Sequence, residues 1–235
     1  KYAVAGVRGR PSGFSLGDGY AVNYGFDDGG RLDSLSWKAG GNSSMVDYAY
    51  LPDANLLAGY ATPTGIRTAY TYEPHRNLKI RVENSGGSSV ISAYDYRYDA
   101  LGRRTSVVNT GTAFAESGLT RYRYNDRGEL TAAERYFGTD PETPGASVEE
   151  QQRAYAYDPI GNRTASIGWN DSQAAQQRVI YETNVLNQYT TLRKNGDENF
   201  PSYDADGNMT DYDGKEYTWN AENRLTSVAP MTPES

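Results

Sequence analysis

The chain has 235 residues, of which 37% are apolar, and its 30 acidic against 23 basic residues give a formal charge of −7. It has no cysteine and a single histidine, His75, which excludes disulfides, a cysteine nucleophile and any multi-histidine metal site made by this chain alone. There is no long basic run and no apolar run of membrane-spanning length, so neither nucleic acid nor a membrane is an expected partner.

Tyrosine and glycine dominate the composition, with 21 and 25 residues. Tyrosine favours strands, and glycine favours turns, so the composition predicts an all-β protein with little helix. The opening KYAVAGVRGR lacks the apolar core of a signal peptide. Because the chain begins and ends in mid-pattern, we expect it to be a segment of a longer protein.

In chain order, the predicted elements are about nine copies of one phrase, which reads aromatic-x-aromatic-acid, two variable residues, then glycine or asparagine. The copies begin at Tyr24, Tyr48, Tyr70, Tyr96, Tyr122, Tyr155, Tyr181, Pro201 and Tyr217. Intervals of this size indicate tandem repeats, so we expect a single repeat array over 1–235 with its copies in 20–228. Residues 138–152, rich in Pro, Gly and Glu, are predicted to be an inserted surface loop.

Each position of the phrase has a physical reason. Aromatics at i and i+2 lie on one face of a strand. The following Asp or Asn starts a turn, and Gly or Asn three residues later accepts a positive φ. The phrase is therefore a hairpin, and nine copies predict about 18 strands in a long coiled antiparallel sheet. We assign structural roles to Tyr24, Phe26, Asp27, Gly30, Tyr96, Tyr98, Asp99, Gly102, Tyr122, Tyr124, Gly128, Tyr155, Tyr157, Asp158, Gly161, Tyr203, Asp204, Gly207, Tyr217, Trp219 and Asn223.

The second and third copies are degenerate, because Pro52 and Pro74 follow their aromatic pairs. Proline cannot donate to a strand ladder, so these turns should differ from the others or lie on an edge.

The phrase Y-x-Y-D-x-x-G-R-L-T resembles the YD repeat of RHS proteins, Tc-toxin shell components, bacterial wall-associated proteins and teneurins. Residues 24–32, 96–103 and 217–228 carry this resemblance most clearly. In that family the repeats form a long β-sheet that spirals into a hollow shell, and the toxin members enclose a polypeptide payload. The resemblance implies an arc or segment of such a shell. Toxin members also carry an autoproteolytic segment with aspartates, which we do not expect here, because the copies run to Val228 and the given sequence stops at Ser235. Residues 158–161 resemble an Asp-Pro-x-Gly boundary of that kind, but they fall in a repeat turn.

Several side-chain groups are candidates for chemical sites. The acid pairs Asp27/Asp28, Asp204/Asp206 and Asp211/Asp213 could serve glycoside cleavage, but they are better explained as turn residues. Residues 204–214 lack the EF-hand spacing, which leaves a calcium site among adjacent turns as an open alternative. His75 has no placed nucleophile and is expected in a solvated turn. We therefore predict no catalytic residue, no metal site and no cofactor.

Among these candidates, the aromatic side chains have the strongest case for binding a ligand. Periodic tyrosines are expected to form cross-strand pairs, whereas Trp37 and Trp169 fall outside the phrase and are the candidate ligand-binding residues. The main hypothesis is a non-catalytic segment of an RHS-type shell that encloses or displays a polypeptide such as a toxin payload. The alternative is a cell-surface module that recognises glycan or protein through loops 138–152, 168–179 and 193–200.

Both hypotheses place the protein outside the cell or on its surface, most simply in bacteria. The expected partners are the remainder of the parent polypeptide or an enclosed toxin domain, and, under the alternative, a surface glycan or protein. Exposed sheet edges also predict self-association.

Overall fold

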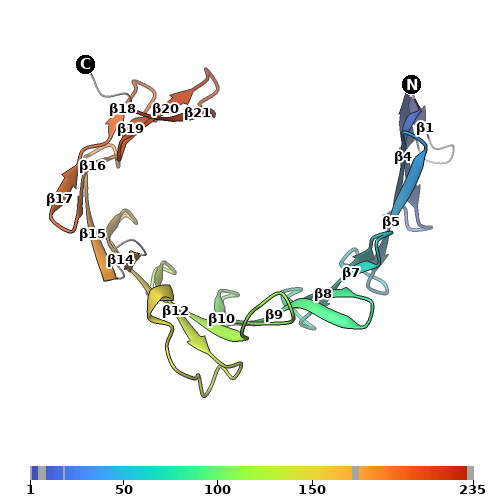
Figure 1. Ribbon diagram of the computed structural model, residues 1–235, viewed down its shortest axis with the longest axis horizontal. Coiled ribbons are helices and arrows are strands. Elements are labelled where there is room, and N and C mark those ends of the chain that lie inside the picture. The colour runs from blue at the N-terminus through green and yellow to red at the C-terminus, as the bar shows by residue number, and fades with distance from the viewer. Residues whose placement is uncertain (1, 5–8, 18, 171–174, 232–235) are drawn as a thin grey trace. The chain divides into compact units, whose positions relative to one another are not determined.

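A computed structural model describes residues 2–4, 9–17, 19–170 and 175–231. The described chain is nearly all β, with 21 strands and one 3-10 turn, Glu149–Gln151 (Figure 1). It divides into two compact units, residues 1–119 with 137–144 and residues 120–136 with 145–235. The predicted all-β, antiparallel fold class is confirmed.

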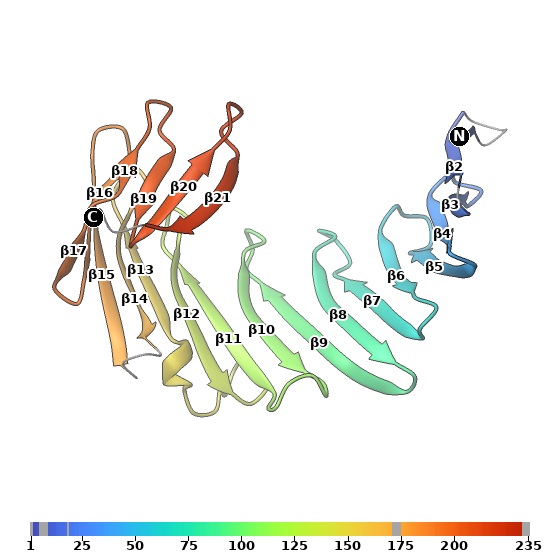
Figure 2. The same cartoon turned by 45° about the horizontal axis from the view of Figure 1, so that its top comes forward.

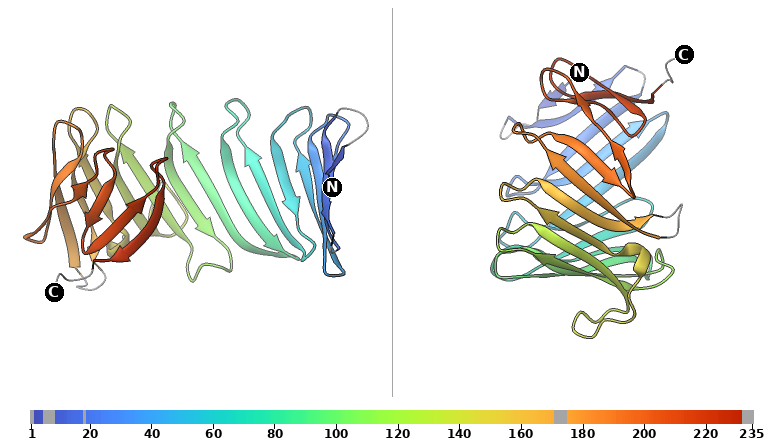
Figure 3. Two further views of the ribbon diagram at one scale, coloured as in Figure 1. Left: turned by 90° about the horizontal axis from the view of Figure 1, so that it is seen from above. Right: turned by 90° about the vertical axis from the view of Figure 1, so that its left-hand side faces the viewer.

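The first unit is a meander in which each strand pairs antiparallel with the next, from β1 to β10. In a meander every second connection lies at the same end of the strands. The phrase turns of this unit therefore all lie along one side of its sheet, where the strands end (Figure 3). The strands are β1 Tyr2–Val4, β2 Pro11–Leu16, β3 Tyr20–Phe26, β4 Leu32–Ala39, β5 Asn42–Tyr50, β6 Leu57–Ala61, β7 Ile66–Tyr72, β8 Lys79–Gly86, β9 Ser89–Tyr98 and β10 Arg104–Thr110.

The second unit continues the same pattern. Strands β12 to β17 pair in sequence, and β18 to β21 form a separate four-stranded sheet of two hairpins (Figure 2). Strand β11, Gly118–Tyr124, begins at the end of the first unit. The remaining strands are β12 Leu130–Phe137, β13 Arg153–Tyr157, β14 Arg163–Asn170, β15 Ala175–Thr183, β16 Tyr189–Lys194, β17 Asp197–Asn199, β18 Ser202–Tyr203, β19 Met209–Tyr212, β20 Lys215–Trp219 and β21 Leu225–Pro230.

Nine hairpins, one for each copy of the phrase, account for the strands from β3 to β21 apart from β17. Strands β1 and β2 precede the first copy. Strand β17 forms an extra hairpin with β16, closed by Asn195 and Gly196, both of which have positive φ. An Asn-Gly pair is the expected two-residue hairpin turn, and it lies within the predicted irregular loop 193–200.

The apolar core is thin. Among the described residues the only buried apolar side chains are Val22, Ala93, Val108, Leu119 and Leu192. A folded chain that buries so little apolar surface must draw more of its stability from cross-strand pairs and hydrogen bonds.

A buried polar row crosses three strands of the first unit. Thr68 Oγ1 donates to Asn84 Oδ1 over 2.7 Å, and Asn84 Nδ2 donates to Ser92 Oγ over 2.9 Å. Thr68 and Ser92 are both buried, so each hydroxyl needs the partner that this row supplies.

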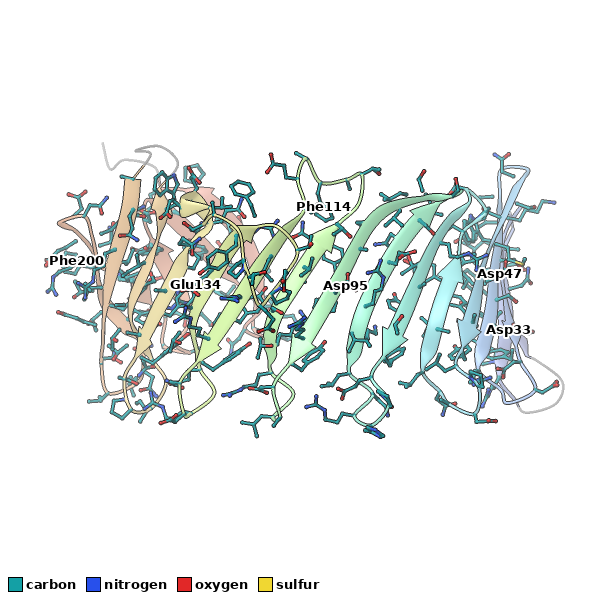
Figure 4. All side chains as sticks on the ribbon, turned by 90° about the horizontal axis from the view of Figure 1, so that it is seen from below. Asp33, Asp47, Asp95, Phe114, Glu134 and Phe200 are labelled. Carbon is teal, nitrogen blue, oxygen red and sulfur yellow. The ribbon has the colours of Figure 1, made fainter. Side chains whose placement is uncertain are left out.

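Two further contacts flank this row. On β8 and β9, Arg81 forms ion pairs with Glu83 and Asp95, at 2.7 Å and 2.5 Å. In the loop after β10, Phe114 meets the ring of Tyr94 edge-on, with ring centroids 5.7 Å apart (Figure 4).

The predicted inserted loop at 138–152 contains bends and the short 3-10 turn, anchored where Val148 N donates to Arg135 O over 2.9 Å. Its first part belongs to the first unit, where Glu142 pairs with Arg97 of β9 at 2.5 Å. Both side chains are more than half exposed, so this ion pair adds little to stability.

Candidate functional site: the repeat turn and the tyrosine clasp

The turn of the phrase is organised by the side chain of its acid or amide. At the fourth copy, Asp99 Oδ1 accepts the backbone N–H groups of Leu101 and Arg103, each over 2.9 Å, while Asp99 N donates to Arg103 O over 3.0 Å. Gly102 N closes the turn by donating to Asp99 O over 3.1 Å. One carboxylate thus satisfies two N–H groups that the turn would otherwise leave unpaired.

The same bonds recur at every regular copy. The side-chain oxygen of the fourth residue of the phrase accepts the backbone N–H of the residue four positions later. The backbone N–H of the fourth residue in turn donates to the backbone oxygen of that same later residue. Seven copies share this arrangement, centred on Asp27, Asp99, Asn125, Asp158, Asn184, Asp204 and Asn220. Asp and Asn are interchangeable here because the bonds use only the Oδ1 oxygen as an acceptor.

The residue three positions after the acid always adopts a positive φ, from 56° at Asn223 to 97° at Gly161. Gly adopts this left-handed backbone readily, and Asn or Asp adopts it at a small cost.

The two degenerate copies have turns that are longer by one residue. Leu51 N donates to Leu56 O and Glu73 N to Leu78 O, so the backbone pair spans five residues where the regular copies span four. Asp53 and Asn77 supply the positive φ. The expectation that the copies with Pro52 and Pro74 have different turns is confirmed.

In eight copies a β-bulge follows the turn, opposite the second aromatic position. In the sixth copy Tyr157 pairs with Arg163 and Ala156 with Ala165, so Thr164 is the extra residue. The same register shift occurs in the first four copies and the last three. A bulge disrupts the ladder locally and bends its strand.

In the six copies given below, the second aromatic of the phrase reaches back to the preceding repeat. Its polar group donates to the backbone oxygen of the residue that opens the returning strand of that repeat. We call this bond the tyrosine clasp. The pairs are Tyr50 to Leu32 (2.9 Å), Tyr72 to Leu57 (2.9 Å), Tyr98 to Lys79 (2.6 Å), Tyr157 to Leu130 (2.9 Å), Tyr203 to Tyr189 (3.1 Å) and Trp219, through Nε1, to Met209 (2.7 Å). The clasp therefore joins neighbouring hairpins, whereas the turn stabilises a single hairpin.

Basic side chains after the turns lie over the rings of phrase tyrosines, including the clasp residue Tyr50. The guanidinium of Arg31 lies 4.6 Å from the ring of Tyr50, and that of Arg104 lies 4.4 Å from the ring of Tyr96. Lys79 Nζ lies 4.1 Å from the ring of Tyr70. Such cation–π contacts are worth about 0.5–1 kcal/mol when exposed.

The turn carboxylates are held in their ionised form. The backbone N–H of Arg31 and then its guanidinium lower the pKa of Asp27 below its ordinary value. The side-chain amides of Asn162 and Asn208 do the same for the pKa of Asp158 and of Asp204. In contrast, burial raises the pKa of Tyr72, Tyr157 and Tyr203, which keeps the hydroxyl protons that the clasp donates.

His75 and the acidic side chains do not form a common site in the part of the chain that the structure describes. His75 is exposed in the third turn. Within the described ranges, no group of three or more His, Cys, Asp or Glu side chains could hold a metal ion. None of the helical residues that the structure describes forms a helix long and apolar enough to cross a bilayer.

Trp37 and Trp169 are both half-buried, but they lie on different faces of their sheets. Trp37 pairs with Val22, and Leu35 pairs with Tyr24, so Trp37 shares the face of the tyrosines. In β14 the residue opposite Tyr155 is Ser166, and Trp169 is an odd number of residues away. Trp169 therefore lies on the face opposite to Tyr155.

The sequence did not point to a hollow of about 220 Å³ in the second unit. It is lined chiefly by residues of β13, β14 and β15, including Arg153, Tyr155, Arg163 and Gln177. The only sequence feature that could have indicated this hollow is Arg163, just after a repeat turn. The same position is also basic in the fourth copy, where Arg104 packs on a tyrosine of the fold.

Turns closed by one side chain, bulges beside them and clasps between them define the chain as an array of tandem β-hairpin repeats. No family model matches it. Over 209 residues, 86% of this chain, it is 30% identical to the tRNA3(Ser)-specific nuclease WapA of Bacillus spizizenii, and the tRNA nuclease WapA of Bacillus subtilis shares the same identity and coverage. The chain spans 8% of the length of each of these curated relatives.

Among solved structures, the fold is similar to that of a chain in the crystal structure of TcdB2-TccC3-Cdc42. The match covers 100% of this chain and 16% of that one, with a TM-score of 0.57 at 11% sequence identity. At this identity the likeness shows a shared fold.

Proposed function

We propose that this chain is a non-catalytic wall segment of an RHS/YD-repeat protein that encloses or displays another polypeptide, such as a toxin payload. The observation that carries the proposal is the tyrosine clasp. In six copies the most distinctive side chain of the phrase serves to join one hairpin to the one before it. The phrase is repeated because the wall must be joined at each repeat, not because a reaction is carried out at each.

Three further observations support this proposal. The chain aligns with 8% of each WapA relative, so the nuclease activity in their names concerns proteins far longer than the matched part. The fold is that of part of a TcdB2-TccC3 chain. The turn carboxylates are engaged with backbone N–H groups, which leaves them poorly placed for acid–base chemistry. On this proposal the protein is secreted or on the surface of a bacterium, and its main partner is the rest of its own polypeptide.

The test uses the full-length protein that contains this segment. Limited proteolysis should leave an enclosed polypeptide intact in the native protein and degrade it after the clasps are removed by Tyr98→Phe, Tyr157→Phe and Tyr203→Phe together. The matched control carries Tyr70→Phe and Tyr155→Phe, because no described acceptor receives a hydrogen bond from either of these hydroxyls. Equal and rapid cleavage of the polypeptide in all three proteins would contradict enclosure.

The alternative function, recognition at the cell surface, is favoured by the two tryptophans outside the phrase. Each is half-buried, and no acceptor in the described residues is bonded to either indole N–H. A glycan array compares the chain with its Trp37→Ala and Trp169→Ala variants, with folding checked by circular dichroism. Because the two rings lie on different faces, surface recognition requires that one variant, and not both, abolish binding.

A further inference from the structure

The hollow in the second unit lies on the tyrosine face of β13, β14 and β15. Cross-strand pairing aligns Tyr155 with Ser166 and Ser166 with Val179, and it aligns Gly168 with Gln177. Cross-strand partners share a face, so these residues line one side of the sheet. The hollow has a volume of about 220 Å³, which corresponds to several water molecules at about 30 Å³ each and suits one small ligand.

Arg163 is the main charged group of the hollow. Its guanidinium lies 5.5 Å from the ring of Tyr155 and 5.3 Å from the ring of Tyr181. Arg31 and Arg103 stand four positions after the aspartate of their turn and form ion pairs with it. In this copy that position is Asn162, which bonds to Asp158 through its amide, and Arg163 follows it. Within the described chain, Arg163 has no carboxylate partner. Two aromatic rings therefore position a guanidinium whose fork of N–H donors is open to a ligand.

Arg153 supplies a second guanidinium. Its Nη1 donates to the backbone oxygens of Glu150 and Gln152, each over 2.8 Å, which orients the group but uses only one of its nitrogens. The side chain crosses over Gly168, where an added Cβ would lie 3.1 Å from Arg153 Cδ. The bare backbone at Gly168 thus makes room for this arginine.

Gln177 adds an amide group without a partner. Its Nε2 is shielded from solvent and finds no acceptor among the described residues. A buried donor without an acceptor costs free energy, and a ligand that supplies the acceptor recovers it. The nearby hydroxyls of Ser166 and Tyr181 are bonded to each other over 2.9 Å.

The charged side chains of the hollow are two arginines. Among the described residues that line it there is no acidic side chain, although the chain as a whole carries a formal charge of −7. We propose that this hollow binds an acidic sugar residue, whose carboxylate is held by Arg163 and Arg153 and whose ring oxygens accept from Gln177.

An acidic sugar fits better than an acidic amino-acid side chain. The sugar carries its carboxylate and several further acceptor oxygens on one ring, whereas Asp or Glu offers the carboxylate alone and would leave the Gln177 donor unpaired. The site lies apart from the clasp bonds, so the proposal does not depend on the wall function.

The experiment titrates the chain with methyl glucuronide, and with methyl glucoside as the uncharged match, followed by NMR or calorimetry. N-acetylglutamate amide serves as the acidic-peptide probe. We expect saturable binding of the glucuronide, at least about tenfold weaker binding of the other two, and weakening of glucuronide binding as salt increases. No saturable binding, or equal binding of the charged and uncharged sugars, would overturn the proposal. Tighter binding of the glutamate probe would overturn it in favour of a polypeptide ligand.

Substitutions in the hollow test whether the glucuronide binds there. Arg163→Gln should weaken glucuronide binding about tenfold or more, and Gln177→Met should weaken it by a smaller factor. The control is Arg178→Gln, because Arg178 pairs with Ile167 and so lies on the opposite face. Unchanged binding in both Arg163→Gln and Gln177→Met, with native circular dichroism, or an equal loss in Arg178→Gln, would contradict the assignment.

Discussion

The hydroxyl of Tyr157 donates a hydrogen bond to the backbone oxygen of Leu130, 27 residues earlier in the chain, over 2.9 Å. This bond joins the sixth hairpin to the fifth. Tyr155, two residues earlier on the same strand, has its hydroxyl bonded to no described acceptor. The two tyrosines of this phrase therefore have different roles, the first through its ring, over which the guanidinium of Arg163 lies, and the second through its hydroxyl.

The seventh copy lacks a clasp because Thr183 occupies the second aromatic position. By the pattern of the other copies, the acceptor would be the backbone oxygen of Arg163, the residue that pairs with Tyr157. We predict that Thr183→Tyr stabilises the chain by about 0.5–1.5 kcal/mol relative to Thr183→Phe, the worth of one hydrogen bond. Urea unfolding of both variants measures the difference. Equal stability of the two would show that no clasp forms there.

The turn aspartates predict how stability depends on pH. Since the folded pKa of Asp99 is lowered, its contribution is present above its unfolded pKa of about 3.9 and is lost as pH falls through the folded value. Burial opposes the shift, but the bonds from Arg103 outweigh it. Asp99→Asn keeps the Oδ1 acceptor, as Asn125 shows in the next copy. This variant should lose less stability between pH 5 and pH 3 (about the range around that pKa) than the wild type does.

The comparison of Asp99→Asn with Asp99→Ala separates the charge from the turn bonds. The alanine variant removes the acceptor for Leu101 and Arg103 at every pH, so it should be less stable than both other proteins at pH 7. Thermal unfolding at several pH values gives the answer. An asparagine variant as pH-dependent as the wild type would mean that Asp99 does not contribute to acid lability.

Substitutions in the fourth turn test the requirement for a residue with positive φ. Gly102 has a φ of 80°, and an added Cβ would meet only Leu78 Cδ1 at an ordinary 3.6 Å. Gly102→Ala should therefore cost about 1–2 kcal/mol through backbone strain alone. Gly102→Asn should cost less, because Asn187 and Asn223 occupy the same position. Denaturant unfolding that ranked asparagine below alanine would refute this account of the turn.

The last strand predicts self-association. Strand β21 pairs with β20 and with no other described strand, and Leu225 and Val228 on it are 46% and 51% exposed. An exposed edge with apolar side chains is a template for pairing with another copy. Sedimentation across a range of concentrations should show reversible association, and Val228→Lys should weaken it. A compact monomer at all concentrations would contradict this prediction.

The hairpins could be predicted from the sequence because the turn is local. Asp99, Leu101, Gly102 and Arg103 lie within five residues, so their types reveal their bonds. The clasp could not be predicted in the same way. Its acceptor is a backbone oxygen, which leaves no trace in residue type, and it lies in the preceding repeat. The six acceptors are accordingly diverse, namely Leu32, Leu57, Lys79, Leu130, Tyr189 and Met209.

The face of the sheet on which Trp169 lies could not be predicted from the sequence pattern either. Counting by twos assigns faces along an unbroken strand, but the bulge at Thr164 inserts a residue and reverses the count. The hollow near Gln177 depends on the same register. It brings residues of three strands together, and most of them, Gln177 among them, lie outside the phrase.

The central claim is that the phrase joins hairpins into a wall. Its most direct test is equilibrium unfolding of two matched double variants in the first unit. Tyr50→Phe with Tyr72→Phe removes two clasps, whereas Tyr48→Phe with Tyr70→Phe removes the hydroxyls two residues earlier, which are not bonded to described acceptors. The account predicts that the first double variant is less stable than the second by about 1–3 kcal/mol. Equal stability of the two, or a greater loss in the second, would contradict it.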